Sequence, residues 1–203
     1  MRELSLNILD IAQNSIAANA SLIRIEVAED TEKGEMRIVI GDNGQGMTPE
    51  QTQRVTDPFY TTRTTRKVGM GTSLFKMAAE MTGGTFNIRS QANEGTKVTA
   101  VFKTRSVDFT PLGDMNSTIS LLIAMNLHID FIYRHSVDGK AFTLQTTELK
   151  QILGDVPLSE PDVVEWIKSY VGEQTQIIHG GVLHENNRRT QRYQRKSKSN
   201  HDR

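Results

Sequence analysis

The segment from Gly41 to Gly71 is polar, rich in glycine and threonine, and lacks the apolar periodicity of a helix or a strand. Connections longer than about 12–15 residues without secondary structure are uncommon in compact domains, and they are usually functional or disordered. A β-branched run at Met36–Gly41 precedes the segment, and a helix predicted at Met70–Met81 follows it. The sequence therefore predicts a frame of regular elements around one long loop that is functional or disordered.

The rest of the first 105 residues predicts that frame. Apolar residues recur three or four positions apart near the N-terminus and predict a helix over residues 2–18. The apolar face of this helix is Leu4, Ile8, Ile11, Ala12 and Ser15. Strands are predicted at Leu22–Ala28, Met36–Gly41, Thr85–Ser90 and Lys97–Lys103. We take residues 1–105 as one domain.

The pattern changes after Arg105. A short helix is predicted at Ser117–Asn126, followed by two strands around the hairpin signal Asp138-Gly139 and by a helix at Pro161–Val171 that Gly172 ends. The strands are Asp130–His135 and Lys140–Thr146. Residues 106–178 are thus predicted to form a small helix-hairpin-helix unit, short for an independent core, that docks on the first domain. Its chemistry is not apparent, and we expect a role in partner recognition or homodimer formation.

Charge is distributed unevenly, although the formal net charge is zero. Residues 183–203 contain seven Lys or Arg against two acidic residues, so they carry +5 and the preceding residues carry −5. We predict that residues 179–203 form a basic, disordered and solvated tail, and we expect no nucleic-acid partner. No cysteine is present, which excludes disulfides and thiolate metal sites. No apolar run has the length of a membrane helix or a signal peptide, so we expect a cytoplasmic protein.

Two polar groupings indicate chemistry. Glu3, Asn7, Asp10 and Asn14 share one face of the first predicted helix, which alone could be a solvated face. The segment GDNGQGM at positions 41–47 directly follows a predicted strand, and its glycines allow the backbone to approach a ligand closely.

In this order, the segments ILDIAQNSIAANAS and GDNGQGM resemble the N and G1 boxes of the Bergerat ATPases, the superfamily of gyrase B, heat-shock chaperones, histidine kinases and MutL. The resemblance implies an α/β fold, an α+β two-layer sandwich in which helices cover a mixed sheet. It also implies that Asn14 binds Mg²⁺ through its amide oxygen and that Asp42 accepts a hydrogen bond from the amino group of adenine. Gly44, Gly46 and Met47 would line the ATP site beside Asp42. Asp10 falls where many relatives have a glutamate that activates water, so it is the predicted catalytic residue.

Later segments extend the resemblance to about residue 103. DPFYTTR resembles the F box of histidine kinases, with Phe59 as an aromatic anchor under the ATP lid. VGMGTSL resembles the G2 box, in which Gly69 and Gly71 would offer amides to phosphate at a helix N-terminus. Arg63 and Lys67 could supply countercharge. The segment EGTKV resembles the G3 box, in which Thr96 would reach adenine.

The G2 segment departs from the usual pattern, because Lys67 and Thr72 stand where a glycine and a leucine are usual. Three functions therefore remain open: a protein kinase of the histidine-kinase or anti-sigma type, a MutL-like ATPase switch, and a nucleotide-binding module without turnover. The DPFYTTR and GMG segments favour the first. No histidine lies in an acceptor pattern and no acceptor helix precedes the N box, so we expect the phosphoacceptor on a separate protein.

Overall fold

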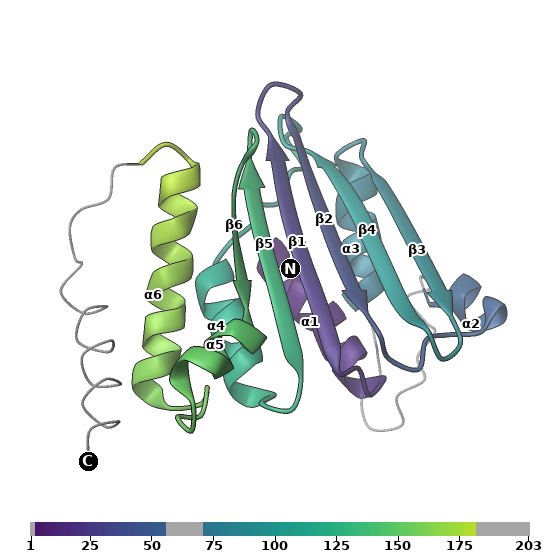
Figure 1. Ribbon diagram of the computed structural model, residues 1–203. Helices are drawn as coiled ribbons and strands as arrows, with labels where there is room; N and C mark the ends of the chain where they lie inside the picture. Colours follow the sequence, from purple (N-terminus) through teal and green to yellow (C-terminus); the bar gives the residue numbers. More distant parts are fainter. Residues whose placement is uncertain (1–2, 56–70, 182–203) are drawn as a thin grey trace, which may run out of the picture.

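The computed structural model describes residues 3–55 and 71–181 of the 203-residue chain. Its strands form one six-stranded sheet in the order β3-β4-β2-β1-β5-β6 (Figure 1). In chain order the elements are α1 (Leu4–Ala17), β1 (Leu22–Asp30), β2 (Glu35–Asp42), α2 (Pro49–Arg54), α3 (Gly71–Met81), β3 (Thr85–Gln91), β4 (Gly95–Lys103), α4 (Met115–Met125), β5 (Asp130–Val137), β6 (Lys140–Gln145), α5 (Thr146–Leu153) and α6 (Pro161–Ile178).

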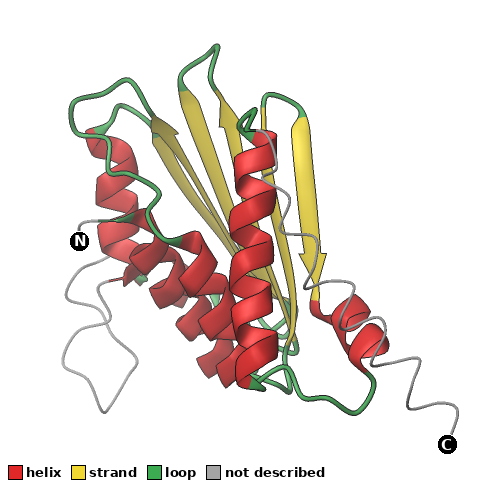
Figure 2. Ribbon diagram, turned by 90° about the vertical axis from the view of Figure 1, so that its left-hand side faces the viewer, coloured by secondary structure: helices red, strands yellow, loops and turns green. Residues whose placement is uncertain are grey.

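The sheet is mixed and has helices on one side. Strands β1 and β5 run parallel, while the other neighbouring strands are antiparallel. Helices α1, α3, α4 and α6 lie on one face, and the other is open except at the end of β6, where the short helix α5 lies (Figure 2). Alternation along the strands sets the two faces: Ile23 and Ile25 of β1 are buried, whereas Arg24 between them is exposed. The predicted α/β two-layer fold is confirmed.

The core lies between the helices and the sheet. The apolar face predicted for the first helix is buried there, including Leu4 and Ile8, which are fully buried. On the β3 side, Phe75 of α3 packs against Phe86 and Phe102 of the sheet. These contacts fix α1 and α3 side by side over the strands, which positions the helix ends that matter below.

Three predictions about local structure are wrong. The long polar segment contains the helix α2, because Thr48 and Gln51 form a capping box and Pro49 occupies the first turn, a start that needs no apolar periodicity. Helix α6 does not end at Gly172 but continues to Ile178. A Cβ atom on Gly172 would lie 2.9 Å from Nδ2 of Asn116 in α4, so this glycine allows close helix packing. Thr146 begins the helix α5 and does not end a strand.

Residues 106–178 continue the sheet of the first half. Strand β5 lies beside β1, and one cluster of buried apolar side chains runs through both parts. The boundary proposed near residue 105 falls in the connection between β4 and α4, where the sheet is not interrupted. The division into two domains stays a prediction, and the predicted tail from residue 182 onward lies outside the described residues. None of the described helices is both long and apolar enough to cross a bilayer.

Candidate functional site

Asp42, the last residue of β2, is held by hydrogen bonds from three separate segments. One oxygen, Oδ2, accepts from the hydroxyl of Ser15 on α1 at 2.6 Å. The other, Oδ1, accepts from the backbone N–H of Gly44 at 2.9 Å and from that of Thr96 at 3.2 Å. These bonds fix the carboxylate at the edge of the helical layer. Oδ1 already accepts two bonds, whereas Oδ2 accepts one and retains a lone pair that can accept from a ligand.

The turn after Asp42 is packed too tightly for side chains at its glycines. A Cβ atom on Gly44 would lie 2.7 Å from the carbonyl oxygen of Ala18. Gly46 has a φ of +62°, and a Cβ there would lie 1.9 Å from the carbonyl oxygen of Gln91. The turn is thus wedged between the end of α1 and the β3–β4 hairpin, which gives the predicted G1 glycines a packing reason of their own.

The start of β4 closes the other side of Asp42. Gly95 has a φ of +112°, and a Cβ atom there would lie 2.0 Å from the Asp42 carbonyl oxygen. The hydroxyl of Thr96 lies 2.8 Å from that of Ser90 on β3. Asn43 ties the same region to β1, because its Oδ1 accepts from the N–H groups of Ser21 and Leu22 at 2.9 Å each.

The N-terminus of α3 meets α1 at Asp10. A Cβ atom on Gly71, the first residue of α3, would lie 2.7 Å from Cβ of Asp10 and 3.2 Å from its Oδ2. Asn14 lies one helical turn further along α1, and both side chains are exposed. Because unpaired N–H groups and the helix dipole favour an anion at a helix N-terminus, this end of the site suits a phosphate.

The structure therefore brings together most of the predicted residues that it describes. Asp42, Gly44, Gly46 and Thr96 surround one point, with Met47 half-buried after them, and α1 connects that point to Asp10, Asn14 and Gly71. Phe59, Arg63, Lys67 and Gly69 lie outside the described residues.

Ser15 is a site residue that the sequence analysis missed. We assigned it to the apolar face of the first helix, where it is indeed buried, but its hydroxyl bonds to Asp42. A hydroxyl on an otherwise apolar helix face was the available signal. The proposed polar seam is also not uniform: Asn7 is buried, and Glu3 accepts from the N–H of Asp114 at 3.3 Å.

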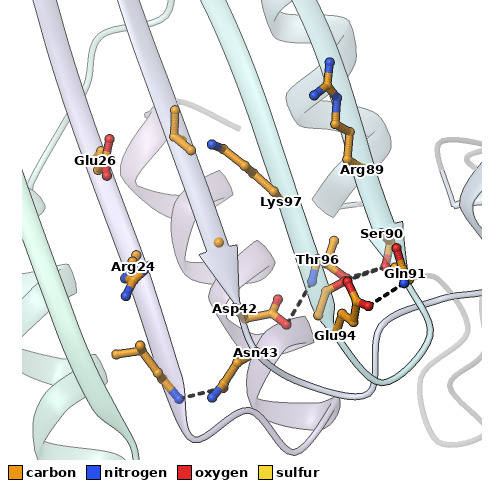
Figure 3. A pocket seen from close by; sticks show the side chains of 14 residues that line it. Arg24, Glu26, Asp42, Asn43, Arg89, Ser90, Gln91, Glu94, Thr96 and Lys97 are labelled. Carbon is orange, nitrogen blue, oxygen red and sulfur yellow. Dashed lines mark hydrogen bonds between the residues drawn. The ribbon is translucent and has the colours of Figure 1, made fainter.

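A hollow of about 560 Å³ lies on the other side of the sheet (Figure 3). It shares Asp42, Gly95 and Thr96 with the site, but Arg24, Arg89 and Lys97 from the open face also line it. Asp10, Asn14 and Gly71 do not line it. We therefore place the candidate ligand site on the helical side, where the carboxylate of Asp42 and the N-terminus of α3 converge.

Comparisons with known proteins identify the family of the first half of the chain. The model of the family described as histidine kinase-, DNA gyrase B-, and HSP90-like ATPase matches residues 1–106. The chain is 28% identical over 94 residues to the sensor histidine kinase YvrG of Bacillus subtilis (strain 168), which covers 44% of this chain and 16% of that protein. It is 27% identical over 108 residues to a putative sensor histidine kinase, NtrY-like, of Rickettsia conorii (strain ATCC VR-613 / Malish 7), covering 53% and 18%. The chain thus spans less than a fifth of the length of these relatives.

A solved structure shares the fold: the N-terminal domain of a DNA repair protein aligns with a TM-score of 0.52 at 18% identity, covering 71% of this chain and 53% of that one. The Aquifex aeolicus MutL ATPase domain complexed with ADP aligns at 14% identity, covering 74% and 67%, with a TM-score of 0.49, which is too low to carry an argument. Since the family model matches more than half of the chain, this protein belongs to the family of histidine kinase-, DNA gyrase B- and HSP90-like ATPases.

Proposed function

We propose that this protein binds ATP with Mg²⁺ between α1 and α3 and transfers the γ-phosphoryl group to a separate protein. The observation that carries the proposal is the fixed carboxylate of Asp42, which hydrogen bonds from Ser15, Gly44 and Thr96 hold at the end of β2. A carboxylate only accepts hydrogen bonds, so a ligand group facing it must donate, as the amino group of adenine does.

The phosphate end of the proposed site is formed by residues of α1 and α3. Gly71 begins α3 beside Asp10, and Asn14 lies one turn away on α1. Mg²⁺ usually takes one or two protein oxygens and completes its shell with phosphate oxygens and water, so the exposed amide oxygen of Asn14 fits it. The ion would neutralise charge on the phosphates.

Asp10 is the described carboxylate that we assign to the chemical step. Its exposed side chain beside the N-terminus of α3 would accept the proton of the attacking group as the bond to the γ-phosphorus forms and ADP leaves. Phosphoryl transfer depends mainly on positioning and charge, which a fixed adenine contact and a helix N-terminus provide together.

Two features support a protein acceptor outside this chain. The matched curated relatives carry the names of sensor histidine kinases, which favours kinase chemistry over hydrolysis alone. Of the described histidines, His135 is almost fully buried and bonds to Glu29, and His179 pairs with the same carboxylate at 3.5 Å. These two are engaged in the fold, so neither suits a phosphoacceptor, whereas the third described histidine, His128, is exposed and has to be replaced to exclude it.

The test is to incubate the purified protein with Mg²⁺ and γ-labelled ATP, with and without a cell lysate, beside its Asp10→Asn variant. A labelled lysate protein that appears with the parent chain and not with the variant supports the kinase. Label released only as free phosphate supports an ATPase switch. ATP binding without transfer or release supports a binding module. No ATP binding would overturn the whole proposal.

A further inference from the structure

The open face of the sheet is strongly cationic, although the residues before 183 carry −5 in total. Five adjacent strands each present one exposed cation on this face that forms no ion pair with any described residue. In sheet order these are Arg89, Lys97, Arg37, Arg24 and Arg134. We name them the cationic row. Positive charge is therefore concentrated on one face of an otherwise acidic body.

Carboxylates on the same face do not neutralise the row. Glu35 already pairs with Lys103, and Asp130 pairs with Lys150 at 2.7 Å. Three carboxylates, Glu26, Asp42 and Glu94, line the hollow together with three cations of the row, Arg24, Arg89 and Lys97. Arg37 and Arg134 lie outside the hollow, so the row as a whole has five cations against these three carboxylates.

The sheet leaves space between Lys97 and Arg24. Arg89 lies directly opposite Lys97 in the sheet, an arrangement of like charges that destabilises strand pairing. Gly41 lies between Lys97 and Arg24, yet a Cβ atom there would find its nearest neighbour, the carbonyl oxygen of Thr96, at 3.9 Å. A side chain would fit at this position, and glycine inside a strand costs stability. Because Gly41 has no side chain, the hollow between the cations stays open (Figure 3).

We propose that this hollow and the cationic row dock an acidic segment of a partner protein. Arginine binds carboxylates through two parallel hydrogen bonds and is enriched in protein interfaces, and four of the five cations are arginines. The floor is apolar, because Val39 is only 7% exposed on the open face of the sheet. Carboxylates two residues apart in an extended segment lie about 7 Å from each other on the same side of it, so one segment can present several of them to this face.

Single-stranded nucleic acid fits this face less well. Proteins that bind it combine a positive groove with aromatic side chains on which bases stack. The described aromatic residues of the strands, such as Phe86, Phe102 and Tyr133, all belong to the core on the helical side. The cationic face thus offers charge and apolar floor without stacking partners, which favours protein carboxylates. This inference is independent of phosphoryl transfer, because no member of the row belongs to the proposed ATP site.

The test measures binding of a fluorescent peptide of alternating glutamate and valine to the full chain. The variant R24E/R89E reverses two charges of the row, and K140E/K168E makes the same change of charge at exposed positions of β6 and α6. Both keep the basic tail, so general attraction is matched. We expect R24E/R89E to weaken peptide binding by tenfold or more, because this variant loses charge pairs in direct contact with the peptide. We expect K140E/K168E to weaken it by about twofold or less, because those lysines lie away from the hollow. Amide chemical shifts of Gly41 and Lys97 should move with the peptide.

Circular dichroism and ATP binding check that each variant is folded. Equal losses in the two variants, or peptide shifts confined to the helical side, would overturn the proposal. The proposal would also be overturned if duplex DNA bound more tightly than the peptide and only R24E/R89E removed that binding, because the face would then bind nucleic acid. Concentration-dependent self-association that R24E/R89E abolishes would identify a second copy as the occupant and overturn it as well.

Discussion

Polar side chains serve different purposes in the two halves of this sheet. In the first half, Asp42 ends β2 with its carboxylate bonded to Ser15 and to two backbone N–H groups, at an edge that a ligand can reach. In the second half, His135 is buried in β5 and its Nε2 lies 2.7 Å from Oε1 of Glu29 on β1. The carboxylate of Asp42 is thus accessible to a ligand, whereas His135 is enclosed by the protein.

The second half also completes the first. The N–H groups of Leu4 and Ser5, which have no partner inside α1, donate to the carbonyl oxygens of Pro111 at 3.0 Å and Leu112 at 2.8 Å. Strand β1 uses β5 as its second neighbour. The half with the ATPase motifs therefore takes backbone hydrogen-bond partners and a neighbouring strand from the half without such motifs.

Removing residues 106–203 tests most directly whether the first half needs the second in order to fold. Truncation would free the edge of β1, expose core residues covered by α4, and leave the first turn of α1 without its acceptors. We expect the fragment 1–105 to lose cooperative unfolding altogether, as followed by circular dichroism during heating. A fragment that melts cooperatively and binds ATP would instead establish residues 1–105 as an independent domain.

Asp10→Asn should separate function from stability. The amide keeps the shape of the side chain, and the position is exposed, so unfolding and ATP affinity should change little. If Asp10 is the base, turnover should fall by about 10²–10⁴-fold. The measurements are labelled-phosphate transfer and release under saturating Mg-ATP, together with a melting curve. A variant with parental turnover would remove Asp10 from the proposed chemistry.

Asp42→Asn should weaken ATP binding by about 10- to 100-fold, because a charge-assisted hydrogen bond is worth about 1.5–3 kcal/mol. Ser15→Ala should weaken it less, by about fivefold, since Asp42 would keep its backbone donors and lose one hydroxyl that orients it. Calorimetry with Mg-ATP checks both. Unchanged affinity in Asp42→Asn would contradict the assignment of the base-binding end.

Local pattern was enough to predict much of the fold. Apolar spacing predicted α1, and alternation predicted the strands. The glycines after Asp42 were interpreted as room for a ligand, and their packing against Ala18 and Gln91 was not predicted. The parallel pairing of β5 with β1 could not be predicted, because it joins segments about a hundred residues apart and no local signal specifies it. Gly172 was misread for the same reason: its role is to accommodate Asn116, which lies far away in the sequence.

Averages concealed other features. A net charge of zero gave no sign of the cationic row, which exists only because alternation along five strands sends the cations to one face. Ser15 was hidden among apolar neighbours, since periodicity assigns a side chain to a face and does not say what it bonds there. The roles of individual site residues remain predictions that the variants above can test.

The enclosed cluster of the second half yields the smallest and most specific prediction. A carboxylate can only accept, so Nε2 of His135 donates to Glu29, and Nδ1 lies 3.3 Å from the Tyr133 hydroxyl. Burial and the nearby Glu29 raise the pKa of Tyr133, which keeps this hydroxyl neutral. Burial alone would raise the pKa of Glu29, but the hydrogen bond from His135 and the charges of His135 and His179 lower it overall.

A lowered pKa in the folded state means that ionised Glu29 stabilises the fold above its usual pKa of 4.5, and that this contribution is lost as pH falls from 4.5 through the lowered value. Glu29→Gln should therefore reduce the free energy of unfolding by about 1–2 kcal/mol at neutral pH, the range for one hydrogen bond to a charged group. The deficit should shrink as pH falls below 4.5 and disappear below the lowered pKa, where Glu29 of the folded parent protein is also neutral. Glu26→Gln makes the same change at an exposed position of β1 and should stay within about 0.5 kcal/mol. Urea unfolding across this pH range measures both, and ATP affinity should be unchanged in each. If Glu29→Gln remained less stable than the parent protein at low pH, the packing of this side chain, and not its charge, would account for the stabilisation.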